Sequence, residues 1–195
     1  MTAGLELIYE HGYEAVSLRQ LAAAVGVQSG SLYNHIKSKQ DLLVTLVVRH
    51  LEDLLSAADK ALEGVDDPDD ALRTFIEFHL TYHISRKREI YIANSELRSL
   101  NPENRKGVVE LRRAYEQKLI DILKDMSKRG RLRAPDTRVT AYAMLSMLTG
   151  VANWFRPDGA LRLGELVHMH TDLIFNGLAA PVEAKAAPAR EARGA

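Results

Sequence analysis

Apolar residues recur at spacings of three and four along almost the whole chain, and no stretch keeps a two-residue alternation. This period is typical of helices that bury one face, so the pattern predicts an all-α protein. The longest amphipathic stretch follows Ser38, with apolar residues at Leu42, Leu43, Leu46, Val47, Leu51, Leu54, Leu55 and Ala58. We expect further helices at residues 71–85, 90–100, 107–129, 135–155 and 163–178. The Asn101-Pro102 pair is expected to end the helix over 90–100.

Residues suited to helix ends bracket the N-terminal helices. A short first helix is expected to end at Gly12, because glycine readily adopts the left-handed conformation that closes a helix. Ser17 and Gln20 have the spacing of a capping box, in which the serine hydroxyl accepts from the Gln20 amide and the glutamine side chain reaches back. A second helix then runs to Gly26, a short third helix follows, and Ser38 opens the long helix with a similar box.

Residues 17–43 have the layout of a helix-turn-helix: one helix, a tight turn at Gly26-Val27-Gln28, and a second helix from about Ser29. The apolar set expected to bury the motif is Leu18, Leu21, Ala22, Val25, Val27, Leu32 and Ile36. The second helix also carries neutral hydrogen-bonding and aromatic side chains, which suit base edges and phosphates in a DNA groove. The alternative for the same pattern is a helical hairpin that serves packing alone.

The same segment closely resembles the DNA-binding domain of TetR-family transcription regulators. The matching positions lie between about Leu5 and Leu46 and comprise Gly12-Tyr13, Ser17, Gly26-Val27, Ser31-Leu32-Tyr33-Asn34-His35-Ile36 and Lys37-Ser38-Lys39-Gln40-Asp41-Leu42. Ile36 departs from the family pattern, which usually has phenylalanine there. The resemblance implies an all-α homodimer whose paired recognition helices bind double-stranded DNA at a near-palindromic operator.

The resemblance also implies a division of the chain. Residues 1–46 would form a three-helix helix-turn-helix DNA-binding domain, and residues 47–178 a helical ligand-binding and dimerisation domain. Residues 179–195, rich in Ala, Pro, Arg and Glu, offer too little apolar surface to fold and are expected to be a disordered tail. The expected DNA-binding residues are Ser17, Arg19, Gln28, Ser29, Gly30, Ser31, Tyr33, Asn34, His35, Lys37 and Lys39.

Composition narrows the function further. The 195 residues carry 26 basic and 26 acidic side chains, and this zero net charge predicts modest non-specific affinity for DNA. There is no cysteine, which excludes disulfides and thiolate sites. No apolar run approaches the ~18 residues of a membrane span, and the first residues do not resemble a secretory signal, so we expect a cytoplasmic protein. No phosphate-binding loop, nucleophile motif or acid–base pair is evident, so neither an enzyme, catalytic residues nor a cofactor is expected.

The C-terminal region carries a second, looser resemblance. Residues 96–117 and 153–167 are similar to TetR-family regulators of lipid and acyl-CoA catabolism. In that subgroup the last two helices form a four-helix bundle between two subunits. The resemblance therefore implies a dimer interface at Trp154, Phe155, Leu166, Met169 and Leu173. The alternative is that Trp154 and Phe155 belong to the core of one chain.

Aromatic, methionine and histidine side chains in this region suit an apolar pocket with a few polar groups. The candidate ligand-binding residues are Phe75, Phe78, His79, Tyr82, His83, Tyr91, Leu97, Arg98, Tyr115, Met144, Met147 and Trp154. Arg98, Arg105, Arg112 and Arg113 are candidates to hold a phosphate or carboxylate head group. The expected effector is a small apolar molecule or an acyl-CoA. The alternative is that the aromatic residues fill a core and the arginines lie on a solvated face.

His79 and His83 are four residues apart, a spacing that can bind a metal ion. No third ligand is evident nearby, so no metal site is expected, and these histidines are expected to hydrogen-bond within a pocket or core. Together the two resemblances imply a repressor that a small molecule releases from its operator. The alternative is a DNA-binding protein of the same fold that a protein partner controls.

Overall fold

A computed structural model of the chain describes residues 2–24, 26, 36–133 and 136–177, and all regular structure within these ranges is helical. The elements are α1 (Thr2–His11), α2 (Leu18–Ala24), α4 (Lys39–Leu62), α5 (Pro68–Ser85), α6 (Lys87–Ser95), the 3₁₀ helix η1 (Glu96–Ser99), α7 (Pro102–Lys128), α8 (Thr137–Trp154) and α9 (Leu163–Asn176). The predicted all-α fold is confirmed.

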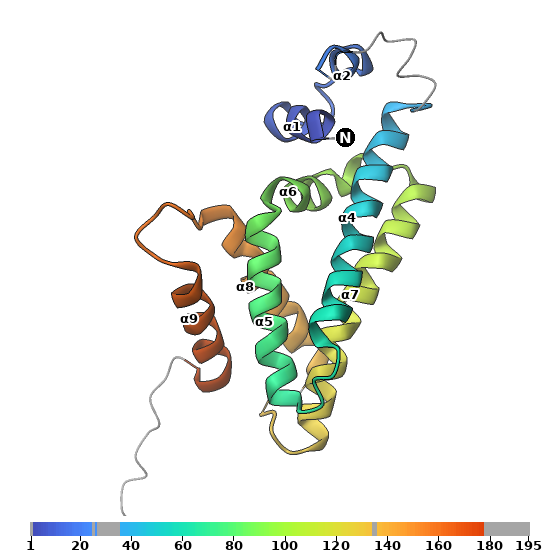
Figure 1. The fold of residues 1–195 in the computed structure, drawn as a ribbon. Coiled ribbons are helices and arrows are strands. Elements are labelled where there is room, and N and C mark those ends of the chain that lie inside the picture. Colours follow the sequence, from blue (N-terminus) through green and yellow to red (C-terminus); the bar gives the residue numbers. More distant parts are fainter. Residues whose placement is uncertain (1, 25, 27–35, 134–135, 178–195) are drawn as a thin grey trace, which may run out of the picture.

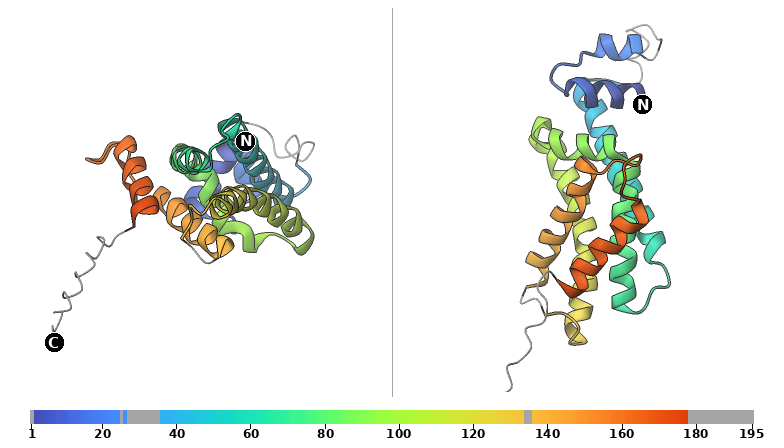
Figure 2. Two further views of the ribbon diagram at one scale, coloured as in Figure 1. Left: turned by 90° about the horizontal axis from the view of Figure 1, so that it is seen from below. Right: turned by 90° about the vertical axis from the view of Figure 1, so that its left-hand side faces the viewer.

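Two parts are stacked along the long helix α4. The helices α1 and α2 lie at one end, where α1 packs against α6 (Figure 1). From there α4 runs down the body beside α7, and it also packs on α5 and α6. The helix α8 packs on α5 and α7, while α9 lies on the outside against α5 (Figure 2). The long helix α4 therefore belongs to the N-terminal part at its first turn and to the body over the rest of its length.

The helix ends follow the predicted capping residues. The backbone N–H of Ser17 donates to Gln20 Oε1 at 2.8 Å, and the backbone N–H of Gln20 donates to Ser17 Oγ at 3.3 Å. At the start of α4, the backbone N–H of Asp41 donates to Ser38 Oγ at 3.0 Å. Gly12 has a φ of 79°, the left-handed conformation expected where α1 ends. These local predictions are confirmed.

The prediction around Asn101 was wrong in one respect. The Asn101-Pro102 pair begins α7, because Asn101 Oδ1 accepts from the backbone N–H of Asn104 at 2.9 Å and proline suits the first helical turn. The helix expected over 90–100 instead starts at Lys87, ends at Ser95 and continues as η1. Similarly, α5 starts at Pro68, earlier than expected, since Asp67 caps it.

The core is continuous from the N-terminal part into the body. Ile8 of α1, Leu43 of α4, Phe75 of α5 and Leu119 of α7 are all fully buried within one cluster. Of the expected buried set, Leu21 and Ala22 are buried, Leu18 and Ile36 are partly buried, and Val25, Val27 and Leu32 lie outside the described residues. Within the described ranges, no helix has both the length and the apolar character needed to cross a membrane.

Candidate functional site

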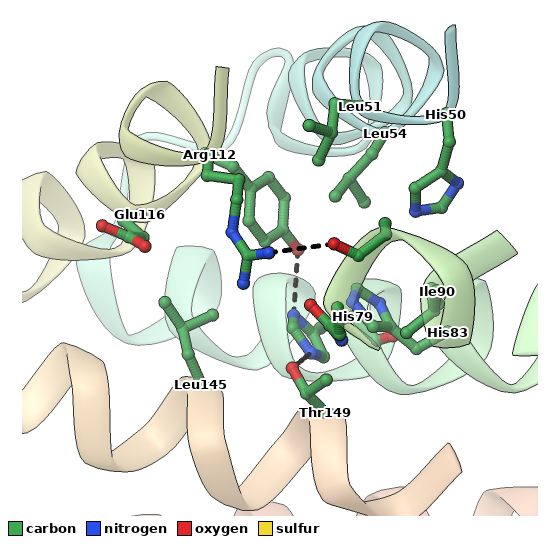
Figure 3. A pocket seen from close by; sticks show the side chains of 13 residues that line it. His50, Leu51, Leu54, His79, His83, Ile90, Arg112, Glu116, Leu145 and Thr149 are labelled. Carbon is green, nitrogen blue, oxygen red and sulfur yellow. Dashed lines mark hydrogen bonds between the residues drawn. The ribbon is translucent and has the colours of Figure 1, made fainter. Parts of the chain in front are cut away.

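A cavity of about 100 Å³ lies in the body between α4, α5, α6, α7 and α8 (Figure 3). Its polar side chains are His50, His79, His83, Arg112, Tyr115 and Thr149, with Asn94 and Glu116 completing the wall. Its apolar side chains are Leu51, Leu54, Ile90, Ala93 and Leu145. A mixed wall of this kind suits a small organic ligand that is oriented by a few hydrogen bonds.

His79 lies on one side of the cavity, and both of its ring nitrogens form hydrogen bonds. Its Nδ1 lies 3.0 Å from the Tyr115 hydroxyl and its Nε2 lies 3.0 Å from the Thr149 hydroxyl (Figure 3). These bonds join α5 to both α7 and α8. Burial, together with the neighbouring His83, lowers the pKa of His79 well below its usual value, so the ring is neutral. Burial also raises the pKa of Tyr115, which keeps its hydroxyl protonated.

His83 and His50 extend this neutral wall. The ring of His83 stacks on that of His79 with centroids 3.7 Å apart, and its Nδ1 donates to the His79 carbonyl oxygen at 2.9 Å. Burial and the nearby His50 lower the pKa of His83 to about 3. Burial, with a contribution from the Arg86 guanidinium, lowers the pKa of His50 to about 4. At neutral pH the three rings are therefore uncharged and present hydrogen-bonding nitrogens without a net charge.

Arg112 is the cationic group of the cavity. It is partly buried on α7, and its guanidinium donates to the Ala93 carbonyl oxygen at 3.2 Å (Figure 3). Among the described residues, no carboxylate forms an ion pair with it. An arginine in this setting retains N–H donors for an anionic or strongly polar group of a ligand.

The structure brings only some of the predicted ligand-binding residues to the cavity. His79, His83 and Tyr115 line it, and Arg112 joins them from the arginine candidates. Fully buried Phe75 packs behind, with its ring centroid 5.5 Å from that of Tyr115. The remaining candidates lie elsewhere: Phe78 and Tyr82 on an outer recess, Met144, Met147 and Leu97 in or against the core, and Tyr91, Arg98 and Trp154 at the surface.

His50, Thr149 and the wall from α6 were not among the residues predicted to line the cavity. His50 falls at an apolar position of α4, between the buried residues Leu46 and Leu54. A histidine at a buried helix position could have indicated from the sequence alone that its side chain faces the interior. Thr149 has no such signal, because only the packing of α8 on α5 brings its hydroxyl to His79. Among the described residues, no three His, Asp or Glu side chains are grouped as a metal site, and His79 has both ring nitrogens in hydrogen bonds.

A polar junction ties the N-terminal part to the body. Gln40, in the first turn of α4, donates from Nε2 to the Ser99 carbonyl at 3.0 Å and to the Tyr13 hydroxyl at 3.3 Å. Its Oε1 accepts from the backbone N–H of Asn101 at 2.7 Å. The buried carboxylate of Glu96 accepts from the backbone N–H of Tyr13 at 3.4 Å. The loop after α1 and the start of α7 are thus bonded to the same turn of α4.

The described part of the expected DNA-binding surface lies at the end of the molecule beyond this junction. Ser17, Arg19 and Lys37 are exposed there. Lys39 is partly buried: its Nζ lies 4.3 Å from the Tyr13 ring centroid and donates to the Glu14 carbonyl at 3.0 Å. The other predicted DNA-binding residues, Gln28, Ser29, Gly30, Ser31, Tyr33, Asn34 and His35, lie outside the described residues.

Both the N-terminal part and the body of the chain match known protein families. Residues 1–46 match the family described as "Bacterial regulatory proteins, tetR family", and residues 65–178 match "Tetracyclin repressor-like, C-terminal domain". The chain belongs to the TetR family. It is therefore a DNA-binding transcription regulator rather than an enzyme, as its sequence predicted.

Three known proteins are similar to this TetR-family chain along most of its length. The TetR-family regulator PfmR from Thermus thermophilus is 38% identical, with a TM-score of 0.83 over 91% of this chain and 97% of that one. The HTH-type transcriptional repressor KstR2 from Rhodococcus jostii is 24% identical over 90% of this chain and 87% of its own length. AibR, solved with isovaleryl coenzyme A and operator DNA, shares the fold with a TM-score of 0.83 and 24% identity, covering 89% of this chain and 94% of that one.

The last two helices of this TetR-family chain present an apolar surface. Trp154 is 55% exposed and Met169 is 58% exposed, and the Trp154 ring stacks near His170 with centroids 6.5 Å apart. Leu173 is partly buried, whereas Phe155 and Leu166 are buried in the core of the single chain. Of the five predicted interface residues, Trp154, Met169 and Leu173 thus remain available to a second subunit.

Proposed function

We propose that this chain is a repressor that binds a near-palindromic operator as a homodimer and is released by an acyl-CoA-type ligand. The ligand would enter the cavity between α4, α5, α6, α7 and α8, with its acyl group against the neutral histidines and a polar part near Arg112. The cavity is the observation that carries the proposal, because its apolar side chains accept an acyl group and its polar groups can orient a thioester. KstR2 is a repressor and AibR was crystallised with an acyl-CoA, and both span most of this chain.

The proposed release follows the path of α4. His50, Leu51 and Leu54 of α4 line the cavity, and Gln40 at the first turn of the same helix holds the junction to the N-terminal part. Ten residues of helix span only about 15 Å. A ligand that displaces the middle of α4 relative to α7 would therefore also shift its first turn. The two recognition helices of a dimer would then no longer match the spacing of the half-sites.

The apolar surface on α8 and α9 supports the homodimer. Val139 and Tyr142 on α8 are 64% and 45% exposed, and together with Trp154 and Met169 they leave apolar side chains in water. Large apolar side chains exposed on two successive helices are consistent with a protein–protein interface. A dimer is also what a palindromic operator requires, since each subunit then reads one half-site.

The test is binding of the purified protein to labelled DNA from upstream of its own gene, by fluorescence anisotropy at physiological salt, with unrelated DNA as control. We expect specific binding that falls by tenfold or more when a matching acyl-CoA is added, because coupling of about 1–3 kcal/mol is typical between two such sites. Specific binding that no acyl-CoA weakens would contradict the proposed ligand. If acyl-CoAs also failed to raise the melting temperature of the protein in a thermal-shift screen, control by a protein partner would be favoured instead.

A further inference from the structure

His50 is a buried imidazole that forms no hydrogen bond with the described residues. It is 5% exposed, it lies in the wall of the cavity, and its buried Nδ1 has no partner among the described residues. No bond to its Nε2 is formed by those residues either. The neutral ring carries one N–H donor and one lone-pair acceptor, and neither has a partner among the described residues. Buried polar groups in native proteins nearly always have partners, which makes this ring a pointer to a ligand.

His83 adds an acceptor whose role is fixed. Its Nδ1 bonds a carbonyl oxygen at 2.9 Å, and a carbonyl only accepts, so Nδ1 carries the proton of the neutral ring. Its Nε2 is therefore an acceptor, and it has no hydrogen-bond partner among the described residues. The stacked neighbour His79 cannot supply one, because both its ring nitrogens are engaged with Tyr115 and Thr149. A ligand that contacts this part of the wall can therefore donate a hydrogen bond to His83 Nε2.

The size of the cavity limits what reaches the two histidines. Its volume is about 100 Å³. An apolar cavity of about 150 Å³ takes up benzene, so this one has room for a short acyl group. Leu51, Leu54 and Leu145 provide the apolar wall for such a group. Arg112 and His50 lie on opposite sides of the cavity (Figure 3), so a polar or anionic end near Arg112 leaves the other end of the ligand toward His50.

We infer that the effector is a short acyl thioester that bears a hydroxyl group, which donates to His83 Nε2 and accepts from His50. This inference rests on the proposed function and narrows its ligand class. A hydroxyl is both a donor and an acceptor, so a single hydroxyl offers a partner to each ring: it donates to His83 Nε2 and accepts from the N–H of His50. A keto oxygen only accepts and leaves His83 unpaired, while a saturated chain leaves both rings unpaired. A long fatty acyl chain exceeds the volume of the cavity.

The experiment compares four probes and free coenzyme A by calorimetry on the full chain, with release of operator DNA as a second readout. The probes are 3-hydroxybutyryl-CoA, acetoacetyl-CoA, butyryl-CoA and palmitoyl-CoA. We expect 3-hydroxybutyryl-CoA to bind at least tenfold more tightly than the other three and to release DNA at the lowest concentration. If butyryl-, acetoacetyl- or palmitoyl-CoA binds as tightly and releases DNA, the hydroxyl inference is overturned while the proposed function stands. If no thioester binds better than free coenzyme A, both are overturned.

Variants of the two histidines separate hydrogen bonding from shape. In His50→Leu and His83→Phe, the preference for 3-hydroxybutyryl-CoA over butyryl-CoA should fall to about twofold or less, while butyryl-CoA affinity is kept. His50→Gln retains a donor and an acceptor and should keep part of the preference. His11→Leu, at an exposed histidine of α1, is the matched control and should change nothing. Unaltered DNA binding without ligand reports that each variant is folded. A preference that persists undiminished in both His50→Leu and His83→Phe would overturn the inference.

Discussion

Gln40 holds the backbone of Asn101 across the boundary between the DNA-binding part and the body, with its Oε1 2.7 Å from the Asn101 nitrogen. The same amide also bonds the Ser99 carbonyl and the Tyr13 hydroxyl. One side chain in the first turn of α4 thus fixes both the loop after α1 and the start of α7. Any displacement of α4 against α7 has to strain or break these bonds.

The first prediction concerns this junction. We expect Gln40→Ala to reduce the ratio of DNA affinity without and with effector by about fivefold or more, because the linked bonds transmit part of the coupling free energy. Anisotropy titrations at both extremes of effector concentration measure that ratio. Gln117→Ala is the control, since Gln117 bonds Asp121 one turn along α7, within its own helix. An unchanged ratio in Gln40→Ala would exclude this junction from the coupling path.

The second prediction concerns Tyr115, whose hydroxyl bonds His79 Nδ1 at 3.0 Å in the buried core. Tyr115→Phe leaves that nitrogen buried and unpaired without changing the shape of the ring. We expect the free energy of unfolding to fall by about 1–3 kcal/mol. Urea denaturation measures it, with Tyr91→Phe as control because Tyr91 is 46% exposed. Equal losses of unfolding free energy in Tyr115→Phe and Tyr91→Phe would show that the buried hydrogen bond does not stabilise the fold.

The third prediction is a loss of stability in mild acid. Folding lowers the pKa of His50 to about 4 and that of His83 to about 3, whereas both titrate near 6.5 in the unfolded chain. Between pH 6.5 and 4 the unfolded state binds protons that the folded state does not bind, so the free energy of unfolding falls as the pH falls. Each histidine contributes a slope of about 1.4 kcal/mol per pH unit, and buried His79 acts in the same direction.

Urea denaturation between pH 7.5 and 4.5 tests this slope. The curve should be flat above about pH 7, and His83→Phe should remove about one proton from the pH dependence below it. Carboxylates with lowered pKa, such as Asp67 and Asp136, act only at lower pH and do not account for a slope that begins near 6.5. Stability that stays constant from pH 7 to 5 would show that the histidines are not buried as described.

Local signals in the sequence predicted most of the fold, because helix ends depend on neighbours along the chain. Ser17 and Ser38 cap the helices they were expected to cap. Asn101, expected to end a helix, instead begins one, because an asparagine before proline equally suits a helix start. The cavity was predicted only in part. His79, His83 and Tyr115 were expected there, but the contribution of α6 and Thr149 depends on how distant helices pack, which no local pattern reports.

The last prediction tests the proposed dimer through Met169, an apolar side chain that is 58% exposed on α9. In a single chain its replacement by glutamate costs little, because the position already faces water, but within a dimer interface it buries an unpaired charge. We expect Met169→Glu to be monomeric by sedimentation velocity, to keep its helical circular dichroism, and to bind the operator about a hundredfold more weakly, since two linked half-site contacts become one. Thr81→Glu places the same charge on an exposed position of α5 and should leave both properties unchanged. A dimeric Met169→Glu with full operator affinity would mean that α9 does not form the subunit interface, and the two half-sites would have to be held together by another surface.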